Sequence, residues 1–267
     1  MTETPLSTQT PLSDQTLPFS MDRRVVIAAP RELVFRYFTD SERWARWWGK
    51  GSTIDPRPQG EVNITHANGI QMGGRVVAIE PPEKIVFTYG YRSGTPIPEG
   101  GSLVTIRLAE HPDGTELHLT HAFAETAMRD EHVQGWRYQL AVFGNVTANE
   151  ARADAGEAVD AWFAAWSEPD TTARESALDR IASPGVRFHD QFSLIDGIAD
   201  LRPHLAAVHK FMPGMRITRE GAVRHCQGTV LANWVARGTD GQERGRGTNV
   251  FVFGPAGDIR SVAGFWG

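Results

Sequence analysis

The chain has 267 residues, a formal net charge of −5 at pH 7 and a single cysteine. This length suffices for two ordinary domains. The negative charge and the absence of a basic cluster argue against a nucleic-acid-binding protein. A single cysteine excludes an intrachain disulfide and a cysteine-based metal site. Without a membrane-length apolar run or a secretory signal, we expect a cytoplasmic protein that does not contact membranes.

The N-terminal part predicts a tail followed by short elements. Residues 1–20 are rich in Thr, Ser, Pro and Gln and predict a disordered tail, because they bury too little to offset the entropy of ordering. Val25-Val26-Ile27 predicts a short strand, and Pro30 suits the first turn of a helix. Thr39 and Glu42 have capping-box spacing, which predicts a second short helix.

Alternating apolar residues predict an antiparallel sheet of about six strands in the rest of the first half. The two clearest faces are Ile85, Phe87, Tyr89 and Tyr91, and Leu117, Leu119, His121 and Phe123. A period of two indicates half-buried strands. An apolar stripe recurring every three or four residues then predicts a helix over 131–149.

These faces suggest an apolar pocket. The candidates for its wall are Tyr89, Tyr91, His121 and Trp136. Sites for small molecules are mostly apolar with a few polar anchors. The alternative is that these side chains fill a solid core and hydrogen-bond locally, as most buried polar groups do.

Several motifs in residues 24–148 occur in the order found in a known family. They are Ile27-Ala-Ala-Pro30, Val34-Phe35, Phe38-Thr-Asp40, Trp47-Trp-Gly49, GGRVVAIEPPEKIVFTY, GTELHLTH and Gly135-Trp136. In these motifs the first half resembles the activator-of-heat-shock-ATPase homologue branch of the START-like superfamily. The resemblance implies a helix-grip domain over residues 21–149, with a curved antiparallel sheet around a long C-terminal helix and a cavity between them. Pro58-Gln59-Gly60 departs from the family's usual double glycine.

The acidic, alanine-rich stretch at 150–157 marks the junction to a second domain over residues 150–267. Helices are predicted at AVDAWFAAW, 173–181 and 198–212, and strands at VRFHDQF, 215–223, 229–237, 245–253 and 258–266. This order indicates a second α+β domain.

The second half is similar to the nuclear-transport-factor-like cone, the fold of SnoaL-type polyketide cyclases and ketosteroid isomerase. Its aromatic first helix, a strand ending in an acid and a Gly-Ile helix start carry the similarity. The resemblance places Asp190 at the position of the isomerase-type catalytic base. It places Trp162 and Asn249 where that family has an oxyanion-hole tyrosine and acid. An indole N–H and an amide match neither group in strength, which argues against isomerase activity.

Asp190 also stands out from the residues alone, because it shares an apolar strand face with Val186, Phe188 and Phe192. Desolvation of a carboxyl group raises its pKa, and such a group can remove a proton next to a carbonyl. His204 is a further candidate general base. The alternative is a structural acid that caps a turn or pairs with an arginine such as Arg246.

The sequence contains no metal-ligand motif and no nucleotide-binding motif, so we expect neither a metal nor a cofactor. Three hypotheses for the function stay open. Two apolar-pocket folds without a complete catalytic set favour a protein that binds small hydrophobic molecules, with Trp162, His204 and Asn249 among the contacts. The second hypothesis is a cyclase, isomerase or hydratase that uses Asp190 as acid or base. The third is a co-chaperone-like regulator of a heat-shock ATPase. Cone domains commonly pair through their sheets, so the resemblance also implies a homodimer.

Overall fold

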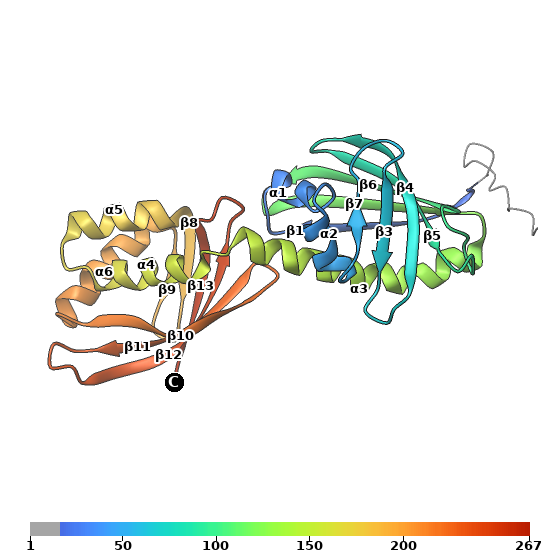
Figure 1. Ribbon diagram of the computed structural model, residues 1–267. Coiled ribbons are helices and arrows are strands. Elements are labelled where there is room, and N and C mark those ends of the chain that lie inside the picture. The colour runs from blue at the N-terminus through green and yellow to red at the C-terminus, as the bar shows by residue number, and fades with distance from the viewer. Residues whose placement is uncertain (1–16) are drawn as a thin grey trace, which may run out of the picture. The chain divides into compact units, whose positions relative to one another are not determined.

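The computed structural model describes residues 17–267, which form two compact units (Figure 1). The first unit contains Arg31–His111 and Thr115–Phe143 together with the preceding strand as far as Val26. The second contains Gly144–Gly267 together with the short segments Ile27–Pro30 and Pro112–Gly114. Residues 1–16 of the predicted tail lie outside the described residues. Both units combine helices with a largely antiparallel sheet, so the predicted α+β class is confirmed.

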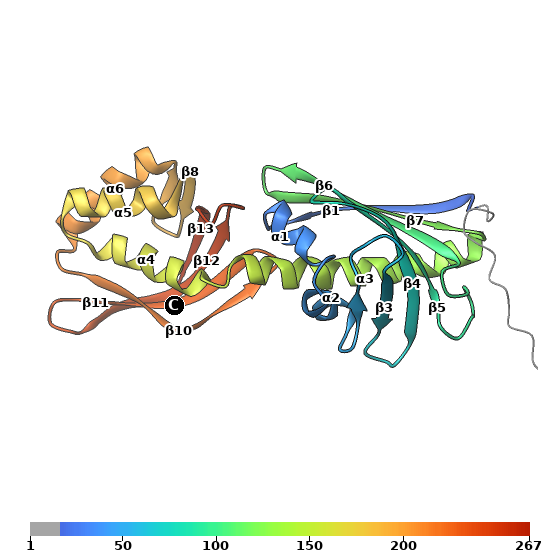
Figure 2. The same cartoon turned by 45° about the horizontal axis from the view of Figure 1, so that its top comes forward.

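The first unit is a seven-stranded sheet in the order β1-β7-β6-β5-β4-β3-β2. Its strands are β1 (Phe19–Ile27), β2 (Thr53–Ile54), β3 (Glu61–Thr65), β4 (Gln71–Glu80), β5 (Lys84–Tyr91), β6 (Ser102–His111) and β7 (Gly114–Phe123). Helices α1 (Arg31–Arg36) and α2 (Ser41–Trp48) lie between β1 and β2, and α3 (Thr126–Ala151) follows β7. The sheet curves around α3, which is the predicted helix-grip arrangement (Figures 1 and 2).

Two local predictions for this unit are wrong. Phe19 and Ser20 were predicted to belong to the tail, but they begin β1. Polar pairs across the strands support this edge strand. For example, the Asp22 carboxylate accepts a hydrogen bond from Thr120 Oγ1 at 2.6 Å. The N-cap of α2 is Asp40 rather than Thr39. Its carboxylate accepts from the backbone N–H groups of Glu42 and Arg43 at 2.9 and 3.1 Å. An aspartate at the N-cap satisfies two otherwise unpaired donors.

Gly135 offers a stabilising substitution in α3. It is exposed in the helix interior, and an added Cβ would meet no atom within 4 Å. Glycine in a helix is less favourable than alanine by about 1 kcal/mol. We therefore expect Gly135→Ala to raise the free energy of unfolding of the first unit by about 1 kcal/mol in urea titrations. A loss of stability would contradict the open environment of this position.

The second unit places three helices on one face of a six-stranded sheet (Figures 1 and 2). The helices are α4 (Ala155–Ser167), α5 (Thr171–Ile181) and α6 (Ile198–Phe211). The strands are β8 (Ala182–His189), β9 (Leu194–Asp196), β10 (Arg216–Cys226), β11 (Thr229–Arg237), β12 (Glu243–Phe253) and β13 (Ile259–Trp266), in the order β10-β11-β12-β13-β8-β9. Only the β13–β8 pair is parallel among the strand pairs of this unit.

The core of the second unit lies between α4 and the inner sheet face. Trp162 and Phe163 meet Phe251 with ring centroids 6.2 and 6.1 Å apart. On β11, Val230 and Trp234 are buried at period-two spacing. The alternation read from the sequence therefore identifies the side of this sheet that the helices cover.

Strand β8 ends earlier than predicted. It stops at His189, so Asp190 follows the strand and Phe192 is 73% exposed. A turn replaces the strand because the Asp190 carboxylate accepts the Phe192 backbone N–H at 2.8 Å and the Asp190 N–H donates to the Ser193 carbonyl at 3.0 Å. Aspartate side chains commonly stabilise such turns.

Candidate functional site

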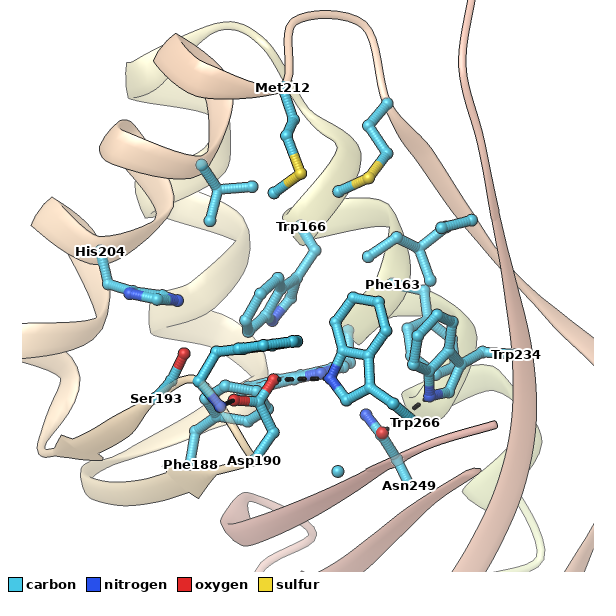
Figure 3. Close-up of a pocket in the computed structure, with 17 residues that line it drawn as sticks. Phe163, Trp166, Phe188, Asp190, Ser193, His204, Met212, Trp234, Asn249 and Trp266 are labelled. Atoms are coloured by element: carbon cyan, nitrogen blue, oxygen red, sulfur yellow. Dashed lines mark hydrogen bonds between the residues drawn. The ribbon is translucent and has the colours of Figure 1, made fainter. Parts of the chain in front are cut away.

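A cavity of about 360 Å³ lies in the second unit, bordered by α4, α6, the β8–β9 turn and the inner face of the sheet (Figure 3). Seven of its 17 lining residues are phenylalanine or tryptophan: Trp162, Phe163, Trp166, Phe188, Phe192, Trp234 and Trp266. Four lining residues are polar: Asp190, Ser193, His204 and Asn249. This composition is typical of sites for small molecules.

The aromatic side chains touch one another around the cavity. Trp166 lies 4.8 Å from Phe188 between ring centroids. Trp266 packs edge-on against Trp234 at 5.0 Å and Phe192 at 5.4 Å. Such edge-to-face contacts add to the stabilisation gained by burial alone. They hold the ring faces in place around a space that stays open.

Asp190 is fixed at the edge of this cavity by two N–H donors. One oxygen accepts the Phe192 backbone N–H at 2.8 Å, and the other accepts the Trp266 indole N–H at 3.1 Å (Figure 3). Among the described residues Asp190 has no ion-pair partner, and Arg246, the predicted alternative, pairs with Glu243 at 2.7 Å. The carboxylate therefore caps a turn, as the structural alternative proposed, and also faces the cavity.

Asn249 presents its amide nitrogen to the cavity (Figure 3). The side chain is buried, and Oδ1 accepts the Trp234 indole N–H at 2.9 Å. An indole N–H can only donate, so the oxygen must face Trp234 and the amide nitrogen must face away. The Trp234–Asn249 bond thus fixes an N–H donor inside an otherwise apolar wall.

Gly264 allows Asp190 and Asn249 to approach each other. It is the partner of Asn249 across the β12–β13 register. A Cβ at this position would lie 3.2 Å from Asn249 Oδ1 and 3.2 Å from Asp190 Cβ. The acid and the amide therefore border the same small space.

His204 reaches the cavity from α6 and is half-buried. Its ring lies 5.9 Å from Trp166 and 6.3 Å from Phe188 between centroids. Burial lowers the pKa of His204, and the charge of Asp190 opposes that change. The imidazole is therefore neutral at neutral pH and can either donate or accept a hydrogen bond.

The structure thus gathers Asp190, Trp162, His204 and Asn249 at one cavity. Ser193, Trp166, Trp234 and Trp266 also line this cavity and were not predicted as site residues. Trp234 carried a usable signal, because it lies on the inward period of β11. Trp266 carried none, because its bond to Asp190 joins residues 76 positions apart.

The side chains predicted to form a pocket wall in the first unit pack together in a network of hydrogen bonds and ring contacts. None of them lines the cavity described above. The Trp136 indole N–H donates to His121 Nδ1 at 2.9 Å, so the neutral ring carries its proton on Nε2. Nε2 then donates to Ser102 Oγ at 2.8 Å, and that hydroxyl donates to the Tyr89 carbonyl at 2.7 Å. Tyr91, half-buried at the end of β5, faces His132 at 6.3 Å. The polar atoms of His121 are therefore satisfied within the domain.

Protonation of His121 should destabilise the first unit. Burial, followed by the charge of His132, lowers the pKa of His121 well below its ordinary value. The unfolded chain takes up a proton below about pH 6.5 while the folded chain does not, so stability falls as pH falls below that value. We expect the free energy of unfolding to drop less steeply between pH 7 and 5.5 in His121→Gln, by up to about 1.4 kcal/mol per pH unit. Equal slopes in the wild type and the variant would contradict this origin.

Among the described residues no group of three or more His, Cys, Asp or Glu is arranged to hold a metal ion. Within the same part of the chain, no helix combines the length and apolar character needed to cross a membrane.

Comparisons with known proteins agree with this division of the chain. Residues 28–147 match the family model described as activator of Hsp90 ATPase homolog 1-like protein, and residues 159–262 match the SnoaL-like domain. The two models together match most of the chain, which therefore joins an AHSA1-like domain to a SnoaL-like domain. A search of curated proteins found no match.

Several solved structures are similar to part of the chain. An AHSA1-like protein from Rhizobium etli is 32% identical over 48% of this chain and 81% of its own, with a TM-score of 0.40. CalU16 from Micromonospora echinospora is 30% identical over 47% of this chain and 73% of its own, with a TM-score of 0.38. A protein of the SnoaL-like family from Agrobacterium tumefaciens is 22% identical over 42% of this chain and 95% of its own, with a TM-score of 0.40.

Proposed function

We propose that this protein binds a small, mainly apolar molecule in the cavity of its SnoaL-like unit. The observation that carries the proposal is a space of about 360 Å³ lined by seven phenylalanine or tryptophan side chains and four polar ones. Its volume falls in the range of ordinary ligand sites, roughly 300–1,000 Å³. Asp190, His204 and Asn249 supply polar contacts, and Trp162 supplies part of the apolar wall.

We place the ligand in the second unit because the buried polar side chains of the first unit already hydrogen-bond within its core. His121 hydrogen-bonds both Trp136 and Ser102, and the Tyr89 hydroxyl donates to the Met72 sulfur. A ligand that entered this core would have to break these bonds, and each buried group left unpaired costs about 1–3 kcal/mol.

A neutral fluorescent probe, N-phenyl-1-naphthylamine, tests the site. We expect saturable binding at one site per chain. Val208 lines the cavity from α6, whereas its neighbour Ala207 is exposed and does not line it. Val208→Trp should therefore weaken binding at least about tenfold by filling space, while Ala207→Trp should leave it unchanged. Equal affinities of the two variants would refute the proposal, and so would a wild type that binds neither this neutral probe nor a cationic apolar one.

An enzyme of cyclase, isomerase or hydratase type, with Asp190 as acid or base, is the second candidate. It is favoured by the position of the Asp190 carboxylate, which two N–H donors hold at the cavity, and by the Asn249 amide N–H close by. A positioned carboxylate next to an N–H donor is an arrangement that can support proton transfer beside a carbonyl.

Asp190→Asn separates these roles. The amide oxygen can still accept the Phe192 N–H, whereas the amide nitrogen cannot accept the Trp266 N–H, so we expect the variant to fold with a small loss of thermal stability. Any turnover that depends on proton transfer by Asp190 should be abolished. A variant that unfolds would make Asp190 a structural residue and would remove the main support for the enzyme.

We also propose that the second unit pairs with a second copy of the chain through the outer face of its sheet. Val252 on β12 is 40% exposed and Phe265 on β13 is 60% exposed. Contiguous exposed apolar surface marks interaction sites, and these two side chains are the apolar groups that such a surface would use. Val252→Glu should then yield a monomer in sedimentation velocity, whereas a wild-type monomer would contradict the pairing.

A co-chaperone role rests on the family of the first unit alone, and fold does not fix function.

A further inference from the structure

The cavity of the second unit has one formal charge and no internal counter-charge. Asp190 is its only acidic lining residue, and none of the residues that line it is lysine or arginine. His204 is the remaining titratable group, and burial keeps it neutral at neutral pH by lowering its pKa. The space therefore carries the charge of one carboxylate.

Aromatic side chains line the same cavity as this carboxylate. The Trp266 indole donates to it, Phe192 packs on Trp266 at 5.4 Å, and Phe188 and Trp166 complete the wall on the other side (Figure 3). The faces of aromatic rings carry negative potential and attract cations, tryptophan most strongly. A carboxylate among such faces produces a combined negative field inside the cavity.

The cost of removing water from the Asp190 carboxylate determines which class of ligand binds best in this cavity. A neutral apolar molecule that fills the cavity would strip water from Asp190 and leave its charge with only two N–H partners. Removing water from an ionised carboxylate without a counter-charge is strongly unfavourable. A cation compensates for the lost water through its charge, and a protonated amine can in addition donate an N–H to the free lone pair that each carboxylate oxygen still has. An anion would be repelled.

We infer that the preferred ligand is an apolar molecule bearing a protonated or quaternary ammonium group, whose charge lies beside Asp190 among the faces of Trp166, Phe188, Phe192 and Trp266. This inference rests on the proposed function, because it requires that the cavity bind a small molecule. It adds the chemical class of that molecule, a lipophilic amine.

Two probes of the same shape isolate the charge. Benzyltrimethylammonium and neopentylbenzene differ only in a nitrogen that replaces a carbon, so both bury the same apolar surface. We expect the cation to bind the wild-type protein at least about tenfold more tightly than its neutral isostere, measured by quenching of tryptophan fluorescence. Benzenesulfonate, an anion, should bind more weakly than either.

Asp190→Asn tests the origin of this preference. The variant should lose at least about tenfold in affinity for benzyltrimethylammonium and bind neopentylbenzene as tightly as before or more tightly. Asp196→Asn is the matched control, because Asp196 is an exposed acid of β9 that pairs with Arg187 outside the cavity. It should change neither affinity.

The outcomes separate the two proposals. If neopentylbenzene binds the wild type as tightly as benzyltrimethylammonium, the inference about charge is overturned and the proposed apolar site stands. If none of the probes binds, both are overturned. The comparison of isosteres in the wild-type protein decides the question even if Asp190→Asn does not fold.

Discussion

Replacing Trp136 with alanine is expected to destabilise the first unit by about 3–5 kcal/mol, the cost of removing a large aromatic side chain from a packed core. Trp136 is 3% exposed and packs against Trp48 and His121 at 5.6 and 5.8 Å between ring centroids. Its loss also leaves His121 Nδ1 without the donor that it has at 2.9 Å. A buried acceptor without a partner adds to the cost.

Tyr138 provides the control for this substitution. It lies on the same helix two residues later and is 71% exposed. In guanidinium titrations of the full chain, Tyr138→Ala should leave the unfolding of the first unit within about 0.5 kcal/mol of the wild type. If Trp136→Ala had an equally small effect, the assigned packing of α3 against the sheet would be wrong.

A second large loss is expected for Trp162→Ala, again about 3–5 kcal/mol but in the second unit. Trp162 is 1% exposed and lies 6.2 Å from Phe251 and 6.3 Å from Phe188 between ring centroids. Because Trp162 also lines the cavity, its removal enlarges a space that already exists. We expect the neighbouring side chains not to refill that space. Costs rise with the size of the cavity left behind.

Phe211→Ala is the matched control for this unit, because Phe211 is 75% exposed at the end of α6. We expect its unfolding free energy to stay close to that of the wild type. Differential scanning calorimetry of both variants measures the comparison. Equal melting temperatures for Trp162→Ala and the wild type would show that the indole does not contribute to the core of this unit.

The sequence predicts element type well where apolar alternation is long. The strand predicted at 229–237 coincides with β11, and the buried side of β7 includes Leu117, Leu119 and His121 as the pattern indicates. The alternation reports which face is buried. It does not report whether that face meets a solid core or an open space, so Tyr89 and Trp162 looked equally suited to a ligand.

The details of the site depend on contacts that no local pattern contains. Asp190 leaves the strand because its side chain bonds the Phe192 N–H, a local competition that period-two spacing conceals. The Trp266–Asp190 and Trp234–Asn249 bonds join residues 76 and 15 positions apart in the chain. Only the folded sheet brings these indoles to their acceptors, so neither the orientation of the amide nor the cap on the carboxylate could be read in advance.

The most direct test of the central claim is a ¹⁵N–¹H spectrum of the tryptophan indoles during titration with N-phenyl-1-naphthylamine. The chain has eight tryptophans. Half of them lie in the core of the first unit, namely Trp44, Trp47, Trp48 and Trp136, and the others line the cavity of the second, namely Trp162, Trp166, Trp234 and Trp266. We predict that the indole resonances of the second unit shift and those of the first stay in place. Shifts confined to the first unit, or no shifts with either this probe or benzyltrimethylammonium, would contradict a ligand site in the SnoaL-like domain.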